Sequence, residues 1–340
     1  MAAVTDLAPP TVASTELLAF CKASADGLRL DILRVLRDES FGVLELCRIF
    51  DMPQPGMSHH LKVLSSANLV ETRREGNSIF YRRSIIMSGH PLGTLFEGLF
   101  DAVDRVPLTA AVVSRVQRVH EERAERSRQF FERHADELKE NQELIARFEQ
   151  YDGCVLDLLG NEHLPDNSNV LEIGPGASDM INLLASRFRH VVALDNSAEM
   201  LEKARGALDP ALVDKTEFVH GEPEHLIGRD AGVDLIVLNM VLHHLPSPAR
   251  MFRTAHRLLN PGGRLLVIDL TPHDQDWARE ICGDLWLGFD PTDLDDWAED
   301  AGMGKGQSVY LGLKNGFQVQ MRLFHRAVDP INNPDNHIEE

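Results

Sequence analysis

The feature that most constrains the fold is an ordered series of apolar runs in the second half of the chain. The first run, residues 169–173, enters a turn that contains Gly174 and Gly176 and then a helical pattern. Four more apolar runs follow, with helical patterns between them, at residues 191–195, 217–220, 233–239 and 264–269. Strands that alternate with helices form a parallel sheet covered on both faces. We therefore expect an α/β, Rossmann-like, doubly wound domain with a cleft at the carboxyl edge of its sheet.

The glycine turn is unsuited to a dinucleotide. Close packing under a pyrophosphate needs a third glycine at position 179, where this chain has Asp179, and a carboxylate there repels phosphate. The second apolar run ends at Asp195, 21 residues beyond Gly174. An acid at this distance typically accepts hydrogen bonds from the two ribose hydroxyls. The pattern indicates a nucleoside ligand without a phosphate.

Five strings in this half resemble the class I S-adenosylmethionine-dependent methyltransferases, over about residues 150–325. They are VLEIGPGASDM, VVALDNSAEMLEKAR, EFVHGEPEHL, DLIVLNMVLHHL and PGGRLLVIDL. A third glycine common in that family is replaced by Ala177 or Ser178. The resemblance implies that S-adenosylmethionine or S-adenosylhomocysteine binds here, with Glu172, Gly174 and Gly176 around the methionine moiety. It also implies roles for Asp195 at the ribose, Asn196 and Met200 beside the adenosine, Glu222 at the adenine amino group and Asn239 below the sulfur.

Other reactive residues give weaker signals. His243 and His244 are adjacent, so on a helix they point about 100° apart, and no third ligand is evident. We therefore expect no metal. His273 follows the fifth strand and is the candidate for a catalytic residue on the acceptor side. The cysteines are scattered, which argues against a disulfide framework, a zinc site and the several thiolates that arsenic methylation would need; they are Cys21, Cys47, Cys154 and Cys282.

The first 90 residues predict a different domain, in which helical patterns are followed by a hairpin. After a turn with two prolines, Met57, Leu61 and Leu64 recur at helical spacing and should face the core. This leaves Ser58, His59 and Lys62 pointing outward, a set suited to the major groove of DNA.

The hairpin is basic. Two β-type runs flank Gly76 and Asn77, and the runs carry Arg73, Arg74, Arg82 and Arg83. Residues 58–83 hold five basic and two acidic side chains. A helix-turn-helix followed by a basic hairpin predicts a winged helix whose DNA contacts include Arg73, Arg74 and Arg82.

The string MSHHLKVLSSANLVETRREGNSIFYRRS resembles the ArsR family of bacterial repressors, over roughly residues 15–90. The resemblance implies a homodimer that places two recognition helices in successive major grooves. Metal-sensing members carry Cys-x-Cys in the preceding helix, whereas this chain has Cys47 and Ile49. One thiolate does not make a soft-metal site, so we expect any inducer to bind elsewhere.

The charge is divided unequally along the chain. The formal net charge of −19 would by itself disfavour binding to a polyanion. However, residues 1–90 hold 10 basic and 10 acidic side chains, residues 91–150 hold 9 and 12, and residues 151–340 hold 15 and 31. The acidity therefore belongs mainly to the methyltransferase-like half, and DNA binding by the first half is not excluded.

These patterns predict four regions: a DNA-binding domain at residues 1–90, a helical dimerisation or linker region at 91–150, a methyltransferase-like domain at 151–328 and a disordered tail at 329–340. Long helices should join the two domains, because residues 108–152 contain neither Gly nor Pro. With no visible secretory signal or membrane span, we expect a cytoplasmic protein with no membrane partner.

The combination of domains leads to the functional hypothesis. It resembles bacterial regulators in which a methyltransferase-like domain senses S-adenosylhomocysteine or S-adenosylmethionine. We expect a repressor that binds operator DNA under control of this nucleoside, for genes of the methionine and methyl cycle. The alternative is an active methyltransferase acting on a small molecule, and the sequence does not decide between them.

Overall fold

The computed structural model describes residues 14–75, 78–84, 90–134, 136–228 and 232–328. The chain divides into two compact units, Met1–Glu122 and Arg123–Glu340. Helix α6 (Ala110–His134) belongs to both, because it begins in the first unit and ends in the second. The region expected at residues 91–150 is therefore shared between the units, and the expected tail lies outside the described residues. Within the described ranges, no helix is both long enough and apolar enough to cross a bilayer.

The first unit is a helical domain with a small antiparallel sheet. Its strands pair in the order β1-β3-β2. Its elements are α1 (Ser14–Ser24), α2 (Gly27–Val35), β1 (Phe41–Gly42), α3 (Val43–Phe50), α4 (Gln54–Ser66), β2 (Val70–Glu75), β3 (Ser78–Arg83), α5 (Gly93–Asp104) and the first part of α6. This order of helices and hairpin confirms the predicted winged helix.

Helix α4 shows why the local sequence folds as it does. Pro55 is tolerated in its first turn because those N–H groups have no partner inside the helix. Met57, Leu61 and Leu64 are fully buried in the core of the unit, as their spacing predicts. Each buried side chain of this size contributes about 1.5–3 kcal/mol. The opposite face of α4 is therefore left to solvent.

The second unit contains a seven-stranded sheet. Its described elements, besides the end of α6, are α7 (Leu138–Ile145), η1 (Phe148–Gln150), α8 (Asp152–Asn161), β4 (Asn169–Ile173), α9 (Met180–Arg187), β5 (His190–Asp195), α10 (Ala198–Ala207), η2 (Pro210–Lys215), β6 (Thr216–His220), η3 (Pro223–Leu226), β7 (Val233–Asn239), η4 (Leu242–His244), α11 (Pro248–Leu258), β8 (Leu259–Leu270), α12 (Trp277–Ile281), α13 (Pro291–Asp300), β9 (Met303–Gly312) and β10 (Gln318–Arg326).

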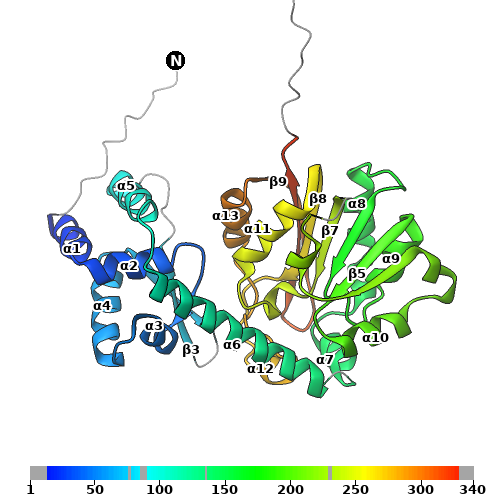
Figure 1. Cartoon of the computed structure of the whole chain (residues 1–340), viewed down its shortest axis with the longest axis horizontal. Coiled ribbons are helices and arrows are strands. Elements are labelled where there is room, and N and C mark those ends of the chain that lie inside the picture. Colours follow the sequence, from blue (N-terminus) through cyan, green and yellow to red (C-terminus); the bar gives the residue numbers. More distant parts are fainter. Residues whose placement is uncertain (1–13, 76–77, 85–89, 135, 229–231, 329–340) are drawn as a thin grey trace, which may run out of the picture. The chain divides into compact units, whose positions relative to one another are not determined.

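The strand order is β6-β5-β4-β7-β8-β10-β9. The first five pair in parallel, and β10 pairs antiparallel with β8 and β9. Figure 1 shows α8, α9 and α10 on one side of the sheet and α11 and α13 on the other. Chain order reverses between β4 and β7, so their carboxyl ends flank a switch point where ligands bind in doubly wound sheets. The predicted Rossmann-like fold is confirmed.

Two parts of this unit differ from the sequence expectation. The helical stretch expected to end near Gly153 is instead divided into α6, α7, η1 and α8, and Gly153 lies in the first turn of α8. The antiparallel pair β9 and β10 was not anticipated. Strand β9 is an edge strand whose side chains are mostly exposed, so it lacks the continuous apolar run that marks the inner strands.

Candidate functional site

A cavity of about 870 Å³, here called the nucleoside cavity, opens at the carboxyl edge of the sheet. This volume lies within the range of small-molecule sites. It is lined by the turn after β4, the ends of β5 and β6, the loop after β7 and the end of α6. The residues with predicted roles that line it are Gly174, Gly176, Asp195, Asn196, Met200 and Glu222.

The ribose-binding candidate, Asp195, ends β5. One of its carboxylate oxygens accepts a hydrogen bond from the Ser197 backbone N–H at 2.8 Å. Burial raises the pKa of Asp195 to about 6, although the N–H groups of Ser197 and Asn196 act in the opposite direction. Beside it, the Asn196 amide donates to Glu222 at 3.0 Å. A fixed carboxylate with remaining acceptor capacity is suited to a diol.

The turn between β4 and α9 requires glycine at its first position. Gly174 has a φ of +67°, and a Cβ atom there would lie 2.3 Å from Val241 Cγ2. Gly176 also has a positive φ, +54°. The Met200 methyl group lies 3.8 Å from the position that a Cβ on Gly176 would take. The turn therefore brings bare backbone to the wall of the cavity.

Glu172, one residue from the end of β4, has no exposed surface. Neither of its carboxylate oxygens has a hydrogen-bond partner among the described residues. Burial without a partner raises its pKa to about 8. An isolated buried carboxylate is costly, so a cationic group that bound beside it would relieve that cost.

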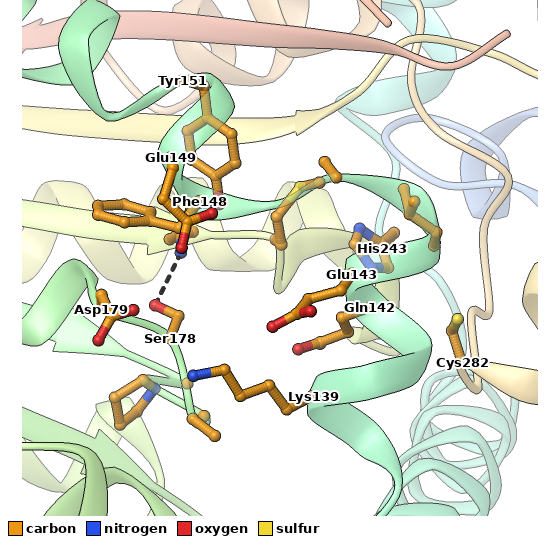
Figure 2. Close-up of a pocket in the computed structure, with 18 residues that line it drawn as sticks. Lys139, Gln142, Glu143, Phe148, Glu149, Tyr151, Ser178, Asp179, His243 and Cys282 are labelled. Atoms are coloured by element: carbon orange, nitrogen blue, oxygen red, sulfur yellow. Dashed lines mark hydrogen bonds between the residues drawn. The ribbon is translucent and has the colours of Figure 1, made fainter. Parts of the chain in front are cut away.

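A second cavity of about 740 Å³, here called the adjacent cavity, shares Gly174, Gly176, Gln142 and Met240 with the first. Figure 2 shows Lys139, Gln142 and Glu143 of α7 pointing into it, with Ser178 and Asp179 on the facing side. Asn239 lines this cavity and not the nucleoside cavity.

Asn239 joins the two walls of the adjacent cavity. The Tyr151 hydroxyl donates to the Asn239 side-chain oxygen at 3.1 Å. The Asn239 amide donates to the Ser178 hydroxyl at 3.2 Å. Burial is the main reason that the pKa of Tyr151 is raised, so this phenol stays protonated. Tyr151 was missed from the sequence, because it follows a helical stretch and carries no motif.

His243 also lines the adjacent cavity. Its Nδ1 lies 2.8 Å from Asp269 Oδ1, and its carbonyl accepts from the N–H groups of Leu285 and Trp286. Burial acts to lower its pKa, but the carboxylates of Asp269 and Asp284 outweigh burial and raise that pKa to about 9. The neighbouring His244 has its pKa lowered, first by burial and then by His243.

The acceptor-side candidate from the sequence, His273, lines neither cavity. Its ring packs edge-on against Phe317 with centroids 4.8 Å apart, and its N–H donates to the Leu287 carbonyl at 3.1 Å. The structure therefore does not bring His273 to either cavity, because the chain after β8 pairs with β10 through the Thr271 N–H and the Gln318 carbonyl. His243 stands at the cleft instead, and its partner Asp269 could have been noticed at the end of the fifth strand.

The first unit carries the candidate nucleic-acid interface. Ser58, His59 and Lys62 are exposed on α4. On the hairpin, Arg82 pairs with Glu71 of the neighbouring strand, and Arg83 turns inward to Asp104 and the Leu33 carbonyl. Arg73 is partly exposed on β2, whereas the Arg74 side chain and the turn at residues 76–77 lie outside the described part. Fewer hairpin charges are therefore available to DNA than the sequence count implied.

Comparison with protein families matches both halves. The model of a methyltransferase domain matches residues 171–267, and that of a helix-turn-helix domain matches residues 25–73. The chain is 34% identical over 104 residues to an arsenite methyltransferase of Halobacterium salinarum, covering 30% of this chain and 27% of that protein. It is 32% identical over 123 residues to a demethylmenaquinone methyltransferase of Lactiplantibacillus plantarum, covering 35% and 52%. The chain thus spans about half or less of these relatives.

Two solved structures align with about half of the chain. The N-methyltransferase NodS from Bradyrhizobium japonicum WM9, in complex with S-adenosylhomocysteine, matches 59% of this chain and 98% of its own, with a TM-score of 0.47 and 16% identity. An S-adenosylmethionine-dependent methyltransferase from Mesorhizobium loti matches 52% and 99%, with a TM-score of 0.41 and 16% identity.

The chain therefore combines a helix-turn-helix domain, which indicates DNA binding, with a methyltransferase domain, which indicates binding of S-adenosylmethionine or S-adenosylhomocysteine. The cleft fits such a ligand on its own chemistry. Asp195 offers acceptors for the ribose hydroxyls. Glu172, predicted beside the methionine moiety, is a buried carboxylate with no hydrogen-bond partner among the described residues, but it lines neither cavity. The turn at Gly174 has no room for a side chain.

Proposed function

We propose that this chain is a DNA-binding transcriptional regulator, a homodimeric ArsR-type repressor. In this proposal the methyltransferase domain binds S-adenosylhomocysteine or S-adenosylmethionine and thereby controls operator binding at genes of the methionine and methyl cycle. The bound nucleoside acts as an effector, held by Asp195, Glu222 and the turn at Gly174.

The observation that carries the proposal is the course of α6. In the first unit, Val112 and Val119 of this helix are buried in the helix-turn-helix core. In the second unit, the same helix supplies part of the wall of the nucleoside cavity, through Ala124, Ser127, Arg128 and Phe131.

One uninterrupted helix of 25 residues therefore has a ligand-facing end and a DNA-domain end. A ligand can shift DNA affinity only if it binds the two DNA-binding states differently. Direct contact with one end of α6 supplies a way for the ligand to favour one position of that helix.

The test combines calorimetry against both nucleosides with gel shifts on the DNA upstream of the gene. For a regulator, saturating nucleoside should change operator affinity at least fivefold, in line with typical coupling energies of about 1–3 kcal/mol. Unchanged operator affinity with either bound nucleoside would contradict the proposal.

A helix-breaking variant tests the role of α6. Glu121 is exposed and lies between the two ends. Glu121→Pro removes a helical hydrogen bond and costs the helix about 3 kcal/mol. We expect each ligand to bind within about threefold of the wild-type affinity, with the coupling between them lost. The matched control, Glu121→Ala, should keep the coupling; if the proline variant keeps it too, α6 does not transmit the signal.

A second candidate function is methyl transfer to a small molecule. The adjacent cavity favours it, because about 740 Å³ of space beside the nucleoside cavity leaves room for an acceptor. Positioning alone accelerates such a transfer greatly. Turnover of S-adenosylmethionine with small-molecule acceptors, together with ligand-independent DNA binding, would establish the enzyme in place of the regulator.

A further inference from the structure

Three metal-ligating side chains meet beneath the cleft of the second unit. His243 and His244 end η4, and Asp284 follows α12 some forty residues later in the chain. One potential ligand atom from each lies within 4.8 Å of the others. The three residues are only 2%, 5% and 3% exposed, so this is not a chance gathering of surface groups. Asp284 is the third candidate ligand, and no local pattern in the sequence indicates it.

The two histidines approach the same carboxylate oxygen. His243 Nε2 lies 3.7 Å from Asp284 Oδ1, and His244 Nδ1 lies 3.9 Å from that atom. In a tetrahedral zinc site with bonds of about 2.0–2.2 Å, neighbouring ligand atoms are separated by about 3.4 Å. Both histidine–Asp284 pairs are therefore within about half an ångström of that spacing, and all three ligand atoms lie within 4.8 Å of one another.

An outer carboxylate already orients one ligand. Asp269 Oδ1 lies 2.8 Å from Nδ1 of His243, which directs the other ring nitrogen toward Asp284. Metal-bound histidines almost always have such a partner on the second nitrogen. Asp269 therefore holds one ring nitrogen of His243, and the other ring nitrogen faces Asp284, where a metal ion would bind.

The buried carboxylates beside His243 are a second reason to expect a bound cation. The side chains of Asp269 and Asp284 both have zero exposure and lie on either side of one imidazole. These carboxylates carry negative charge beside the histidine nitrogens, which favours binding of a cation. His244 Nδ1, the nitrogen that faces Asp284, lies 3.3 Å from the Gly283 carbonyl oxygen, and metal binding at this nitrogen would replace that contact.

We propose that His243, His244 and Asp284 bind one divalent transition-metal ion of the zinc type, with Asp269 as the outer partner of His243. Two imidazole nitrogens and a carboxylate are a ligand set that zinc accepts, and three protein ligands leave a fourth position for water or a bound group. The ion would cross-link the segment around Asp284 to the segment after β7 that contains His243 and His244. It goes beyond the proposed function, because neither regulation nor methyl transfer requires it.

The experiment uses full-length protein, stripped with a chelator and titrated with Co²⁺ and then Zn²⁺. We expect one equivalent of Co²⁺ to give the visible absorption of a tetrahedral site and Zn²⁺ to displace it. Asp284→Asn and His244→Gln should each weaken cobalt binding at least a hundredfold. The matched controls His190→Gln and Asp214→Asn change exposed residues of the same unit and should bind as the wild type does.

Binding that is absent, or that survives both cluster variants, would overturn the proposal. If a variant fails to fold, the cobalt and zinc titration of the wild-type protein still tests the proposal. Crystals of the full chain soaked in Zn²⁺ should show an anomalous peak within bonding distance of all three side chains, and a peak elsewhere, or none, would show that the cluster is an ion-pair network only. Nucleoside affinity is measured on the same stripped protein, so that failure of the metal site is distinguished from failure of the nucleoside site.

Discussion

The two units place their candidate functional groups in opposite environments. In the first unit, Ser58, His59 and Lys62 are exposed on a helix face, and their action on DNA would depend on charge and shape at the surface. In the second, Glu172 and Asp195 are buried or nearly so, and burial raises the pKa of each. Residues 1–122 hold 13 basic and 15 acidic side chains, whereas residues 123–340 hold 21 and 38.

Because of this difference, we expect DNA binding and nucleoside binding to respond to different solution conditions, salt for the first and pH for the second. Contacts between exposed cations and phosphates release counterions, so DNA binding should depend steeply on salt. Contacts to buried carboxylates depend on the protonation state of those groups, so nucleoside binding should depend on pH and little on salt.

The largest effect is expected from reversing charge on the hairpin. Arg73→Glu with Arg74→Glu replaces attraction to phosphate by repulsion, and operator affinity should fall on the order of a thousandfold. Nucleoside affinity should stay within twofold, because the nucleoside cavity lies wholly in the other unit. Gel shifts and calorimetry measure the two quantities.

A matched control is Arg189→Glu with Arg250→Glu, which makes the same change of net charge in the second unit. If this control weakens DNA binding equally, the effect comes from overall charge and the hairpin assignment is wrong.

The next largest effect concerns stability and Glu172. The folded pKa of about 8 is above the ordinary value of 4.5, so the protonated acid is the form that the fold favours. Its contribution to stability is complete below about pH 4.5 and is lost as the pH rises through 8. At 1.36 kcal/mol per pKa unit, the wild type should lose about 4 kcal/mol relative to Glu172→Gln between pH 4.5 and pH 8.

Tryptophan fluorescence reports this unfolding selectively, because Trp277, Trp286 and Trp297 all belong to the second unit. The exposed Glu217→Gln serves as the control and should follow the wild type across the pH range. A constant difference between Glu172→Gln and the wild type would mean that the pKa of Glu172 is the same in the folded and unfolded states.

Asp195 should produce a smaller effect, on affinity. Asp195→Ala removes charged hydrogen bonds to the ribose and should weaken nucleoside binding by about 1.5–3 kcal/mol, or roughly 10- to 150-fold. In the wild type, protonation below the pKa of about 6 should weaken binding about tenfold between pH 7 and pH 5, since only the carboxylate accepts both hydroxyls.

Calorimetry of both proteins at the two pH values checks this, with Asp214→Ala as an exposed control. If the alanine variant shows the same pH dependence as the wild type, another group is responsible, and the ribose assignment fails.

The difference between buried and exposed segments also explains which elements could be predicted from the sequence. Apolar periodicity placed the inner strands well: residues 233–239 were expected and β7 has those bounds, while Met57, Leu61 and Leu64 are buried as expected. Both patterns follow from burial, which leaves a local signature in the sequence. The exposed β9 leaves none, and it was missed.

The site was predictable only where a residue follows a strand end directly. Gly174, Asp195 and Glu222 were found in this way, and they line one cavity. Tyr151, Asp284 and the wall from α6 reach the cleft through packing between segments far apart in the chain, so no local pattern marks them. His273 also follows a strand end, but it lines neither cavity, so its position after a strand was not sufficient to place it there.

The smallest effect is expected at Lys62, and it tests the surface half of the comparison most directly. The residue is exposed on α4, one helical turn after Ser58. If Lys62 contacts a phosphate, Lys62→Ala should weaken operator binding by about 0.5–1.4 kcal/mol, and the slope of log affinity against log salt should become shallower by about 0.9. The loss should be alike on operator and unrelated DNA, whereas a loss confined to the operator would mean that Lys62 contacts a base edge. The exposed Lys314→Ala, in the second unit, should change neither quantity. If Lys62→Ala weakened operator binding without changing the salt slope, Lys62 would not act by neutralising a phosphate. The expected contrast between a first unit that binds through surface charge and a second unit that binds through buried groups would then be wrong.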